Sequence, residues 1–144
     1  MPDAWPKKIE GLIPHRPPML VVDELISATG ESAESSMVFD ENCLFLNAGG
    51  QVEEAVLFEM MAQTFAALAC LGRGPEEAPS AGFLVGLKWM TLYGPARVGS
   101  PVNVNVRIFS RVDDYSVVEG QAFQDGKLLA AGRLTVYVPQ GGRV

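Results

Sequence analysis

Residues 55–71 restrict the possible folds of this chain more than any other segment. The segment is apolar on every face and rich in good helix formers, and only Glu59, Gln63 and Thr64 interrupt it. A helix with apolar side chains all round has to be enclosed by the rest of the molecule. The remaining sequence must therefore supply the layer that covers this helix.

Signals at both ends set the limits of the helix. Glu53 and Glu54 suit the positive end of its dipole, and Gly72, Gly74 and Pro75 terminate it. At about 1.5 Å per residue the helix is just short of a bilayer span, and two polar side chains at its centre make membrane insertion costly. We therefore expect a buried helix and no membrane partner.

Both flanks of the helix are expected to form strands. Before it, apolar residues at 19–22 and 25–26 and an alternating run at 32–39 predict two strands, preceded by a short arm or one-turn helix at 7–12. After it, alternation and turn residues predict four more. These four cover residues 82–89, 102–106, 116–123 and 128–138, with turn signals at 94–95, 113–114 and 125–126.

The length of 144 residues suits one ordinary domain, so we expect a single domain over residues 1–144. Apart from the predicted strands, no other part of the chain is available to cover the apolar helix. The sequence thus predicts an α+β fold in which a curved antiparallel sheet wraps around one long central helix, which is the hot-dog fold.

Charge and composition argue against several kinds of partner. A net charge of −6 and a pI near 4.7 disfavour nucleic acid, which proteins bind through a basic stripe. Cys43 and Cys70 have no metal-ligand spacing and the chain has one histidine, so we expect neither a metal nor another cofactor. The N-terminus lacks the layout of a secretion signal, and two cysteines make a poor disulfide framework. We expect a cytoplasmic protein.

Three segments resemble one known family. Residues 13–23, IPHRPPMLVVD, resemble the opening of β-hydroxyacyl carrier-protein dehydratases of the FabZ type. Residues 57–63, LFEMMAQ, resemble the helix motif in which that family carries a catalytic acid followed by a glutamine. Residues 82–88, with Pro95 and residues 99–101, are similar in layout to the strand and turn that follow. Within the family, the chain looks closest to the aryl-polyene-type branch of dehydratase-like proteins.

The resemblance implies the hot-dog fold, an acyl thioester of acyl carrier protein (ACP) or coenzyme A (CoA) as the bound molecule, and a homodimer or higher oligomer. If the sheets of two copies paired edge to edge, the dimer would also cover a strand edge that is exposed in the single chain. The chain departs from the family at one place. The dehydratases carry a catalytic histidine in a loop before the helix, whereas residues 42–50 here read NCLFLNAGG. One half of the family's acid–base pair is absent from its usual position.

The candidate catalytic residues are Glu59, Gln63 and His15. Glu59 matches the family's acid, and Gln63, one turn later, is placed to orient the carboxylate or the thioester. Alternatively, both satisfy buried backbone groups or pair across a dimer. His15 is the single imidazole that could replace the missing partner, although the matching family histidine is not catalytic and a capping hydrogen bond would also explain it. Asp23 is expected to form an ion pair, with Arg16 as the candidate partner.

Other residues are predicted to contact the acyl thioester. The glycines of the turn at 47–50 would let backbone N–H groups approach the thioester oxygen, and apolar side chains would line an acyl tunnel. A plain loop and an ordinary hydrophobic core are the alternatives. The predicted substrate-binding residues are Phe45, Gly49, Gly50, Met60, Phe83, Leu84, Val85 and Gly86.

Three functions fit these features. The first is a lyase that dehydrates a 3-hydroxyacyl group on ACP or CoA, in fatty-acid or polyene-type biosynthesis. The second is a hot-dog thioesterase, in which a helix carboxylate acts without a histidine. The third is a non-catalytic subunit that pairs with a competent dehydratase and contributes part of its tunnel wall.

Overall fold

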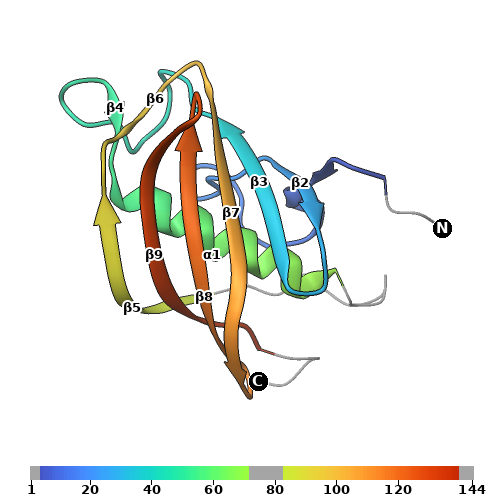
Figure 1. Cartoon of the computed structure of the whole chain (residues 1–144). Coiled ribbons are helices and arrows are strands. Elements are labelled where there is room, and N and C mark those ends of the chain that lie inside the picture. The colour runs from blue at the N-terminus through green and yellow to red at the C-terminus, as the bar shows by residue number, and fades with distance from the viewer. Residues whose placement is uncertain (1–3, 72–82, 140–144) are drawn as a thin grey trace.

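The computed structural model describes residues 4–71 and 83–139 and has one long helix, α1 (Ala55–Cys70), wrapped by a curved antiparallel sheet (Figure 1). The strands are β1 (Lys7–Lys8), β2 (Glu24–Ala28), β3 (Ser32–Val38), β4 (Gln51–Val52), β5 (Phe83–Leu92), β6 (Ala96–Arg97), β7 (Pro101–Val112), β8 (Tyr115–Gln124) and β9 (Lys127–Tyr137), with a 3₁₀ helix at Ile9–Gly11. The predicted α+β hot-dog architecture is confirmed.

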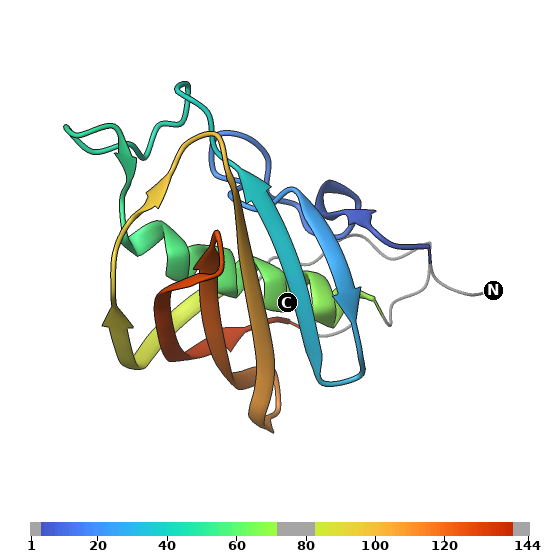
Figure 2. The same cartoon turned by 45° about the horizontal axis from the view of Figure 1, so that its top comes forward.

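The main sheet has seven strands in the order β1-β2-β3-β7-β8-β9-β5, and β4 pairs with β6 in a separate two-stranded sheet. After β5 the chain crosses one end of the molecule through β6 before it enters β7 (Figure 2). β5 therefore does not pair with β7, the next strand of the same sheet along the chain. It pairs with β9 and lies at an edge of the sheet.

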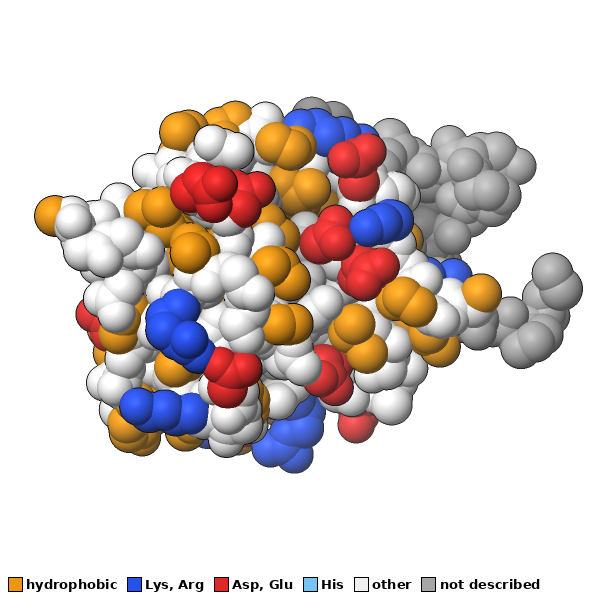
Figure 3. Space-filling view, turned by 90° about the horizontal axis from the view of Figure 1, so that it is seen from above, with side chains coloured by type: hydrophobic (Ala, Val, Ile, Leu, Met, Phe, Trp, Pro, Cys, Tyr) orange, Lys and Arg blue, Asp and Glu red, His pale blue; other side chains and the backbone are white. Residues whose placement is uncertain are grey.

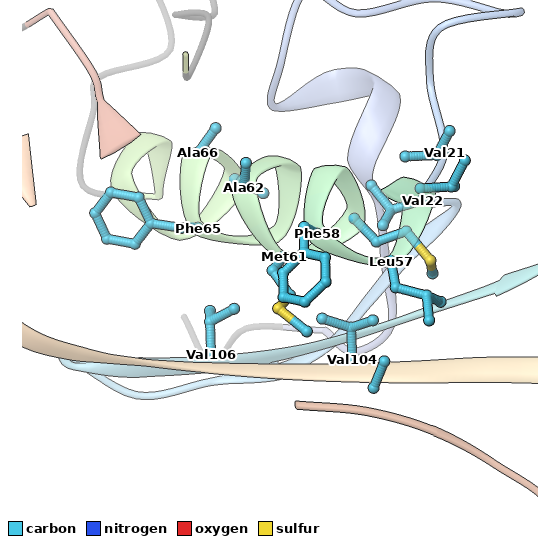
Figure 4. Close-up of a cluster of buried hydrophobic side chains, with 14 of the residues drawn as sticks. Val21, Val22, Leu57, Phe58, Met61, Ala62, Phe65, Ala66, Val104 and Val106 are labelled. Atoms are coloured by element: carbon cyan, nitrogen blue, oxygen red, sulfur yellow. The ribbon is translucent and has the colours of Figure 1, made fainter. Parts of the chain in front are cut away.

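The apolar helix is enclosed, as the sequence predicts. Every residue of α1 is buried except Ala55, Glu59 and Ala69. Figure 4 shows side chains of α1 pointing at the sheet, where valines of β7 meet them, while the segment before β2 packs near the start of the helix. Burying each of the larger side chains, from valine to phenylalanine, contributes about 1.5–3 kcal/mol. The helix is therefore the centre of one continuous core.

Two glycines in the sheet permit the close approach of the helix. A Cβ at Gly120 would lie 2.6 Å from the sulfur of Met61, and one at Gly132 would lie 2.6 Å from Cε1 of Phe58 and 3.0 Å from the backbone oxygen of Trp89. The backbone oxygen of Trp89 has little freedom to move away, because β5 and β9 are paired there. No larger residue fits at Gly132 without displacing the helix or the edge strand.

We therefore expect Gly132→Ala to destabilise the protein by about 1–3 kcal/mol, the usual cost of overpacking a core. Urea unfolding followed by circular dichroism measures this change. Gly94→Ala is the matched control, because a Cβ at Gly94 meets no atom within 4 Å. Equal unfolding midpoints for the two variants would contradict this account of the packing.

The described residues also correct the prediction in one region. Residues 19–22 do not form a strand; β2 begins at Glu24, after the proline-containing segment. The short helix near residue 9 and the Asp125–Gly126 hairpin are confirmed, and both turn residues have positive φ, 52° and 77°, as a type I′ turn requires.

The predicted helix stop at Gly72, Gly74 and Pro75 lies outside the described residues. Within the described ranges, no helix combines the length and the apolar character that crossing a membrane requires.

Candidate active site

Glu59 and Gln63 lie one turn apart on α1 and are hydrogen-bonded to each other. Gln63 Nε2 donates to Glu59 Oε2 at 2.9 Å and to the carbonyl of Met19 at 2.9 Å. Gln63 Oε1 accepts from the backbone N–H of Val21 at 3.0 Å. The side chain of Gln63 is completely buried, and both hydrogens of its amide are used. Its orientation is therefore fixed by partners on two segments of the chain.

This arrangement combines two roles that the sequence presents as alternatives. Gln63 satisfies buried backbone groups of the segment before β2, and the same amide holds one oxygen of the Glu59 carboxylate. Among the residues that the structure describes, no partner is found for the other oxygen, Oε1. Glu59 is only partly buried, so its carboxyl group is not in a fully dry pocket. It is oriented by the protein and still reachable from outside.

Glu59 opens onto a cavity of about 630 Å³, within the size range of small-molecule sites. The start of α1 forms one wall, the segment before β2 forms another, and the first residues of β5 form a third. The lining residues are His15, Met19, Val21, Phe45, Glu53, Ala55, Val56, Glu59, Phe83 and Leu84. Most of these side chains are apolar, which suits an acyl chain next to one oriented carboxyl group.

The structure brings some of the predicted substrate-binding residues into this cavity and places others elsewhere. Phe45, Phe83 and Leu84 line it together with Glu59. Met60 belongs to α1, and its side chain is completely buried in the core. Val85 and Gly86 continue along β5, beyond the two residues of that strand that line the cavity.

The turn at 47–50 uses its N–H groups internally. The N–H of Gly49 donates to Asn47 Oδ1 at 2.8 Å, and the N–H of Gly50 donates to the Asn47 carbonyl at 3.0 Å. Gly50 has φ of 76°, which favours glycine at this position. Gly49 and Gly50 thus shape the loop around Asn47, and neither lines the cavity beside Glu59.

His15 lies in the wall of the cavity that contains Glu59. The guanidinium group of Arg16 donates to the carbonyls of Ile13 and His15, at 2.9 and 2.7 Å, and so fixes the local backbone. The expected pairing of Asp23 with Arg16 is wrong: Asp23 pairs with Lys8 at 3.1 Å, and its hydrogen bond raises the pKa of the Lys8 ammonium.

Sequence reasoning missed Met19, Val21, Glu53, Ala55 and Val56 as cavity residues. Gln63 hydrogen-bonds the backbone of the first two and so ties them to α1 across more than 40 positions of sequence. A buried glutamine in an otherwise apolar helix was the available signal, since its amide must find partners on another segment.

Comparisons with known proteins agree on a family. The model of the ApeP-like family, described as ApeP dehydratase, matches residues 7–143. A 3-hydroxyacyl-[acyl-carrier-protein] dehydratase FabZ from Thermomicrobium roseum is 31% identical over 139 residues, covering 93% of this chain and 91% of the relative. The FabZ of Streptococcus equi subsp. zooepidemicus is 28% identical over 133 residues, covering 90% and 94%.

Solved structures show the same fold. The dehydratase heterocomplex ApeI:P from Xenorhabdus doucetiae contains a chain that superposes with a TM-score of 0.84 at 24% identity, covering 96% of this chain and 93% of that one. Thioesterase superfamily member 2 from Mus musculus gives 0.60 at 22% identity, covering 78% and 79%. The family model spans nearly all of the described residues, including every residue that lines the cavity. The chain therefore belongs to the ApeP-like dehydratase family.

Proposed function

We propose that this protein dehydrates a 3-hydroxyacyl thioester, with Glu59 as a proton-transferring group. The FabZ relatives, which carry that activity in their names, align over nine-tenths of the chain. The reaction removes a proton from C2 and a hydroxyl group from C3 of the acyl chain, so it requires a base, an acid and a site that excludes bulk water. A mostly apolar cavity with one oriented carboxyl group supports this chemistry.

One observation carries the proposal. Gln63 binds one oxygen of Glu59, and Glu59 itself lines the cavity. A carboxyl group held in this way stays in one orientation while it gains or loses a proton, which reduces the reorganisation that the reaction requires. The start of α1, at Ala55 and Val56, lines the same cavity. The positive end of the helix dipole there favours negative charge developing on a thioester oxygen.

The test is an assay of the purified protein on matched 3-hydroxyacyl thioesters of pantetheine, CoA and ACP. Dehydration produces an enoyl thioester, which is followed by its ultraviolet absorbance, and hydrolysis produces a thiol, which is followed with a thiol reagent. The proposal expects enoyl formation. Thiol release without enoyl product would instead identify a thioesterase, which the loop at residues 42–50 favours because it has no histidine.

The acyl group is expected to arrive on ACP or CoA in the cytoplasm, where the thiols of Cys43 and Cys70 remain reduced. On the face shown in Figure 3, acidic and basic side chains are interspersed with apolar ones. Docking of an acidic carrier on this face would then depend on a few local contacts and not on a broad basic area.

We further propose that the working form is at least a dimer that pairs along β5. This strand is ten residues long and lies at the edge of the main sheet, and within the described part of the chain its outer edge has no partner. Large apolar side chains are exposed along it, at Phe83, Val85, Leu87, Trp89, Met90 and Leu92. A long exposed strand edge with apolar side chains is a surface on which another chain can pair. Because Phe83 and Leu84 also line the cavity, a second chain on β5 would lie beside the site.

Val85→Lys is expected to weaken this association at least tenfold, because it places a charge on the exposed edge strand. Sedimentation equilibrium over a range of protein concentrations measures the change. The control is Val112→Lys at the end of β7, where a valine is also exposed. A dimer of unchanged affinity in the Val85 variant would remove β5 from the interface.

The partner on β5 is either a second copy or a different dehydratase subunit. The structural relative comes from a dehydratase heterocomplex, which supports the second possibility, a different dehydratase subunit. If the purified protein forms no enoyl product alone but forms it when mixed with a second dehydratase subunit, the chain acts as part of a mixed assembly. Activity of the protein alone favours the homodimer.

A further inference from the structure

We propose that His15 is the second proton-transferring group of this site and takes the place of the histidine that the loop at 42–50 lacks. The inference rests on the proposed dehydratase function and adds a residue to it. Its basis is the position of the imidazole: His15 and Glu59 line one cavity, although 44 positions separate them in sequence, as the residue numbers show.

The imidazole of His15 has an unused buried nitrogen. Nδ1 is shielded from solvent and, within the described residues, has no hydrogen-bond partner. A polar atom in this state is destabilising unless something pairs with it, and few such atoms occur in folded proteins. A hydrogen bond that anchors the imidazole, which was the alternative explanation of His15, is not present at Nδ1. The part of the ring that lines the ligand-sized cavity, and not the shielded Nδ1, is what a bound molecule reaches.

The segment that carries His15 is held at both ends. Arg16 fixes the backbone on one side by its bonds to the carbonyls of Ile13 and His15. On the other side, Gln63 binds the carbonyl of Met19 and the N–H of Val21, and the same amide binds Glu59. One side chain therefore fixes the position of Glu59 relative to the segment of His15. This coupling is what an acid–base pair on two segments requires.

The titratable side chains that line the cavity are His15, Glu53 and Glu59. Glu53 is exposed at the start of the helix, and a second carboxylate would repel Glu59 when both are charged. An imidazole changes its charge in the range near neutral pH and exchanges a proton with a carboxyl group without that repulsion. His15 is the better complement to Glu59.

The two groups divide the chemistry as follows. Neutral His15 takes the proton from C2 while the C2–C3 double bond forms and the C3–O bond breaks. The protonated carboxyl group of Glu59 gives its proton to the leaving hydroxyl group, which departs as water. The imidazolium then returns a proton to the Glu59 carboxylate, so that both groups regain their starting states and no further reactant is needed.

Substitution of His15 is the first test. We expect His15→Asn and His15→Gln to lower kcat for enoyl formation at least 100-fold, with KM changed less than threefold, and to remove one limb of the pH–rate profile. A merely structural histidine would not change the shape of that profile. Glu10→Gln, an exposed residue of the same N-terminal segment, is the control and should keep wild-type activity.

A second measurement does not depend on turnover. Since the chain contains one histidine, its imidazole signals in ¹⁵N-labelled protein belong to His15 without further assignment. We expect a non-reacting 3-hydroxyacyl pantetheine amide to shift these signals, and pantetheine alone, which has no acyl C2, to shift them less. Signals that neither compound moves, together with histidine variants within threefold of wild-type kcat, would overturn the inference.

These outcomes separate the inference from the function on which it rests. If the wild type forms enoyl product and the Glu59 variant does not, while the His15 variants remain active, only the role of His15 fails. If no enoyl product forms, alone or with a partner subunit, the proposed function fails and the role of His15 fails with it.

Discussion

Replacing Glu59 with glutamine is expected to lower kcat for enoyl formation at least 100-fold while the free energy of unfolding changes by less than about 0.5 kcal/mol. The amide has the shape of the carboxyl group and keeps an oxygen that accepts the hydrogen bond from Gln63. It does not exchange a proton with substrate at neutral pH. The substitution therefore removes the chemistry and retains the packing, and initial rates by enoyl absorbance measure the effect.

Glu54→Gln is the matched control for this prediction. Glu54 lies immediately before α1, is partly buried like Glu59, and does not line the cavity. Its variant should keep activity within threefold of wild type. If Glu59→Gln has the same activity as Glu54→Gln, Glu59 has no part in the reaction and the proposed site is in the wrong place.

The fold was predictable because its main signals are local. The helix at 55–71 has an apolar surface too large for any position but the centre, and alternating strands with glycine and aspartate turns follow it. What the sequence does not contain is the pairing of β5 with β9. That pairing depends on the connection through β6, which crosses one end of the molecule. No local sequence pattern predicts which strand of a sheet will be the partner of β5.

The site was predictable in part for a similar reason. Glu59 and Gln63 belong to one helix, so their spacing alone places them on the same face. The cavity is different, because residues from several separate segments line it, including the loop of Phe45 and the first residues of β5. These segments come together only through tertiary packing, which the local sequence does not predict. The roles of Glu59, Gln63 and His15 stay predictions until the variants are made.

Gln63→Leu is expected to destabilise the protein by about 2–4 kcal/mol and to lower kcat at least tenfold. The leucine has a similar volume but offers no polar atom, so the N–H of Val21 and the carbonyl of Met19 each lose their partner. A buried group left in this way costs about 1–3 kcal/mol. Urea unfolding measures the stability change, and rates are compared under conditions where both proteins are fully folded.

The loss of activity has its own physical cause, and this separates the variant from an ordinary core mutation. Without the amide, Glu59 Oε2 loses its donor and the segment of His15 loses its attachment to the helix, so the two groups no longer keep a fixed separation. Gln121→Leu makes the same change at an exposed position of β8 and should alter stability by less than about 0.5 kcal/mol. A Gln63 variant that is destabilised but retains wild-type kcat would show that this amide only supports the fold. Loss of both properties would show that one side chain joins the two segments of the site and orients its carboxyl group.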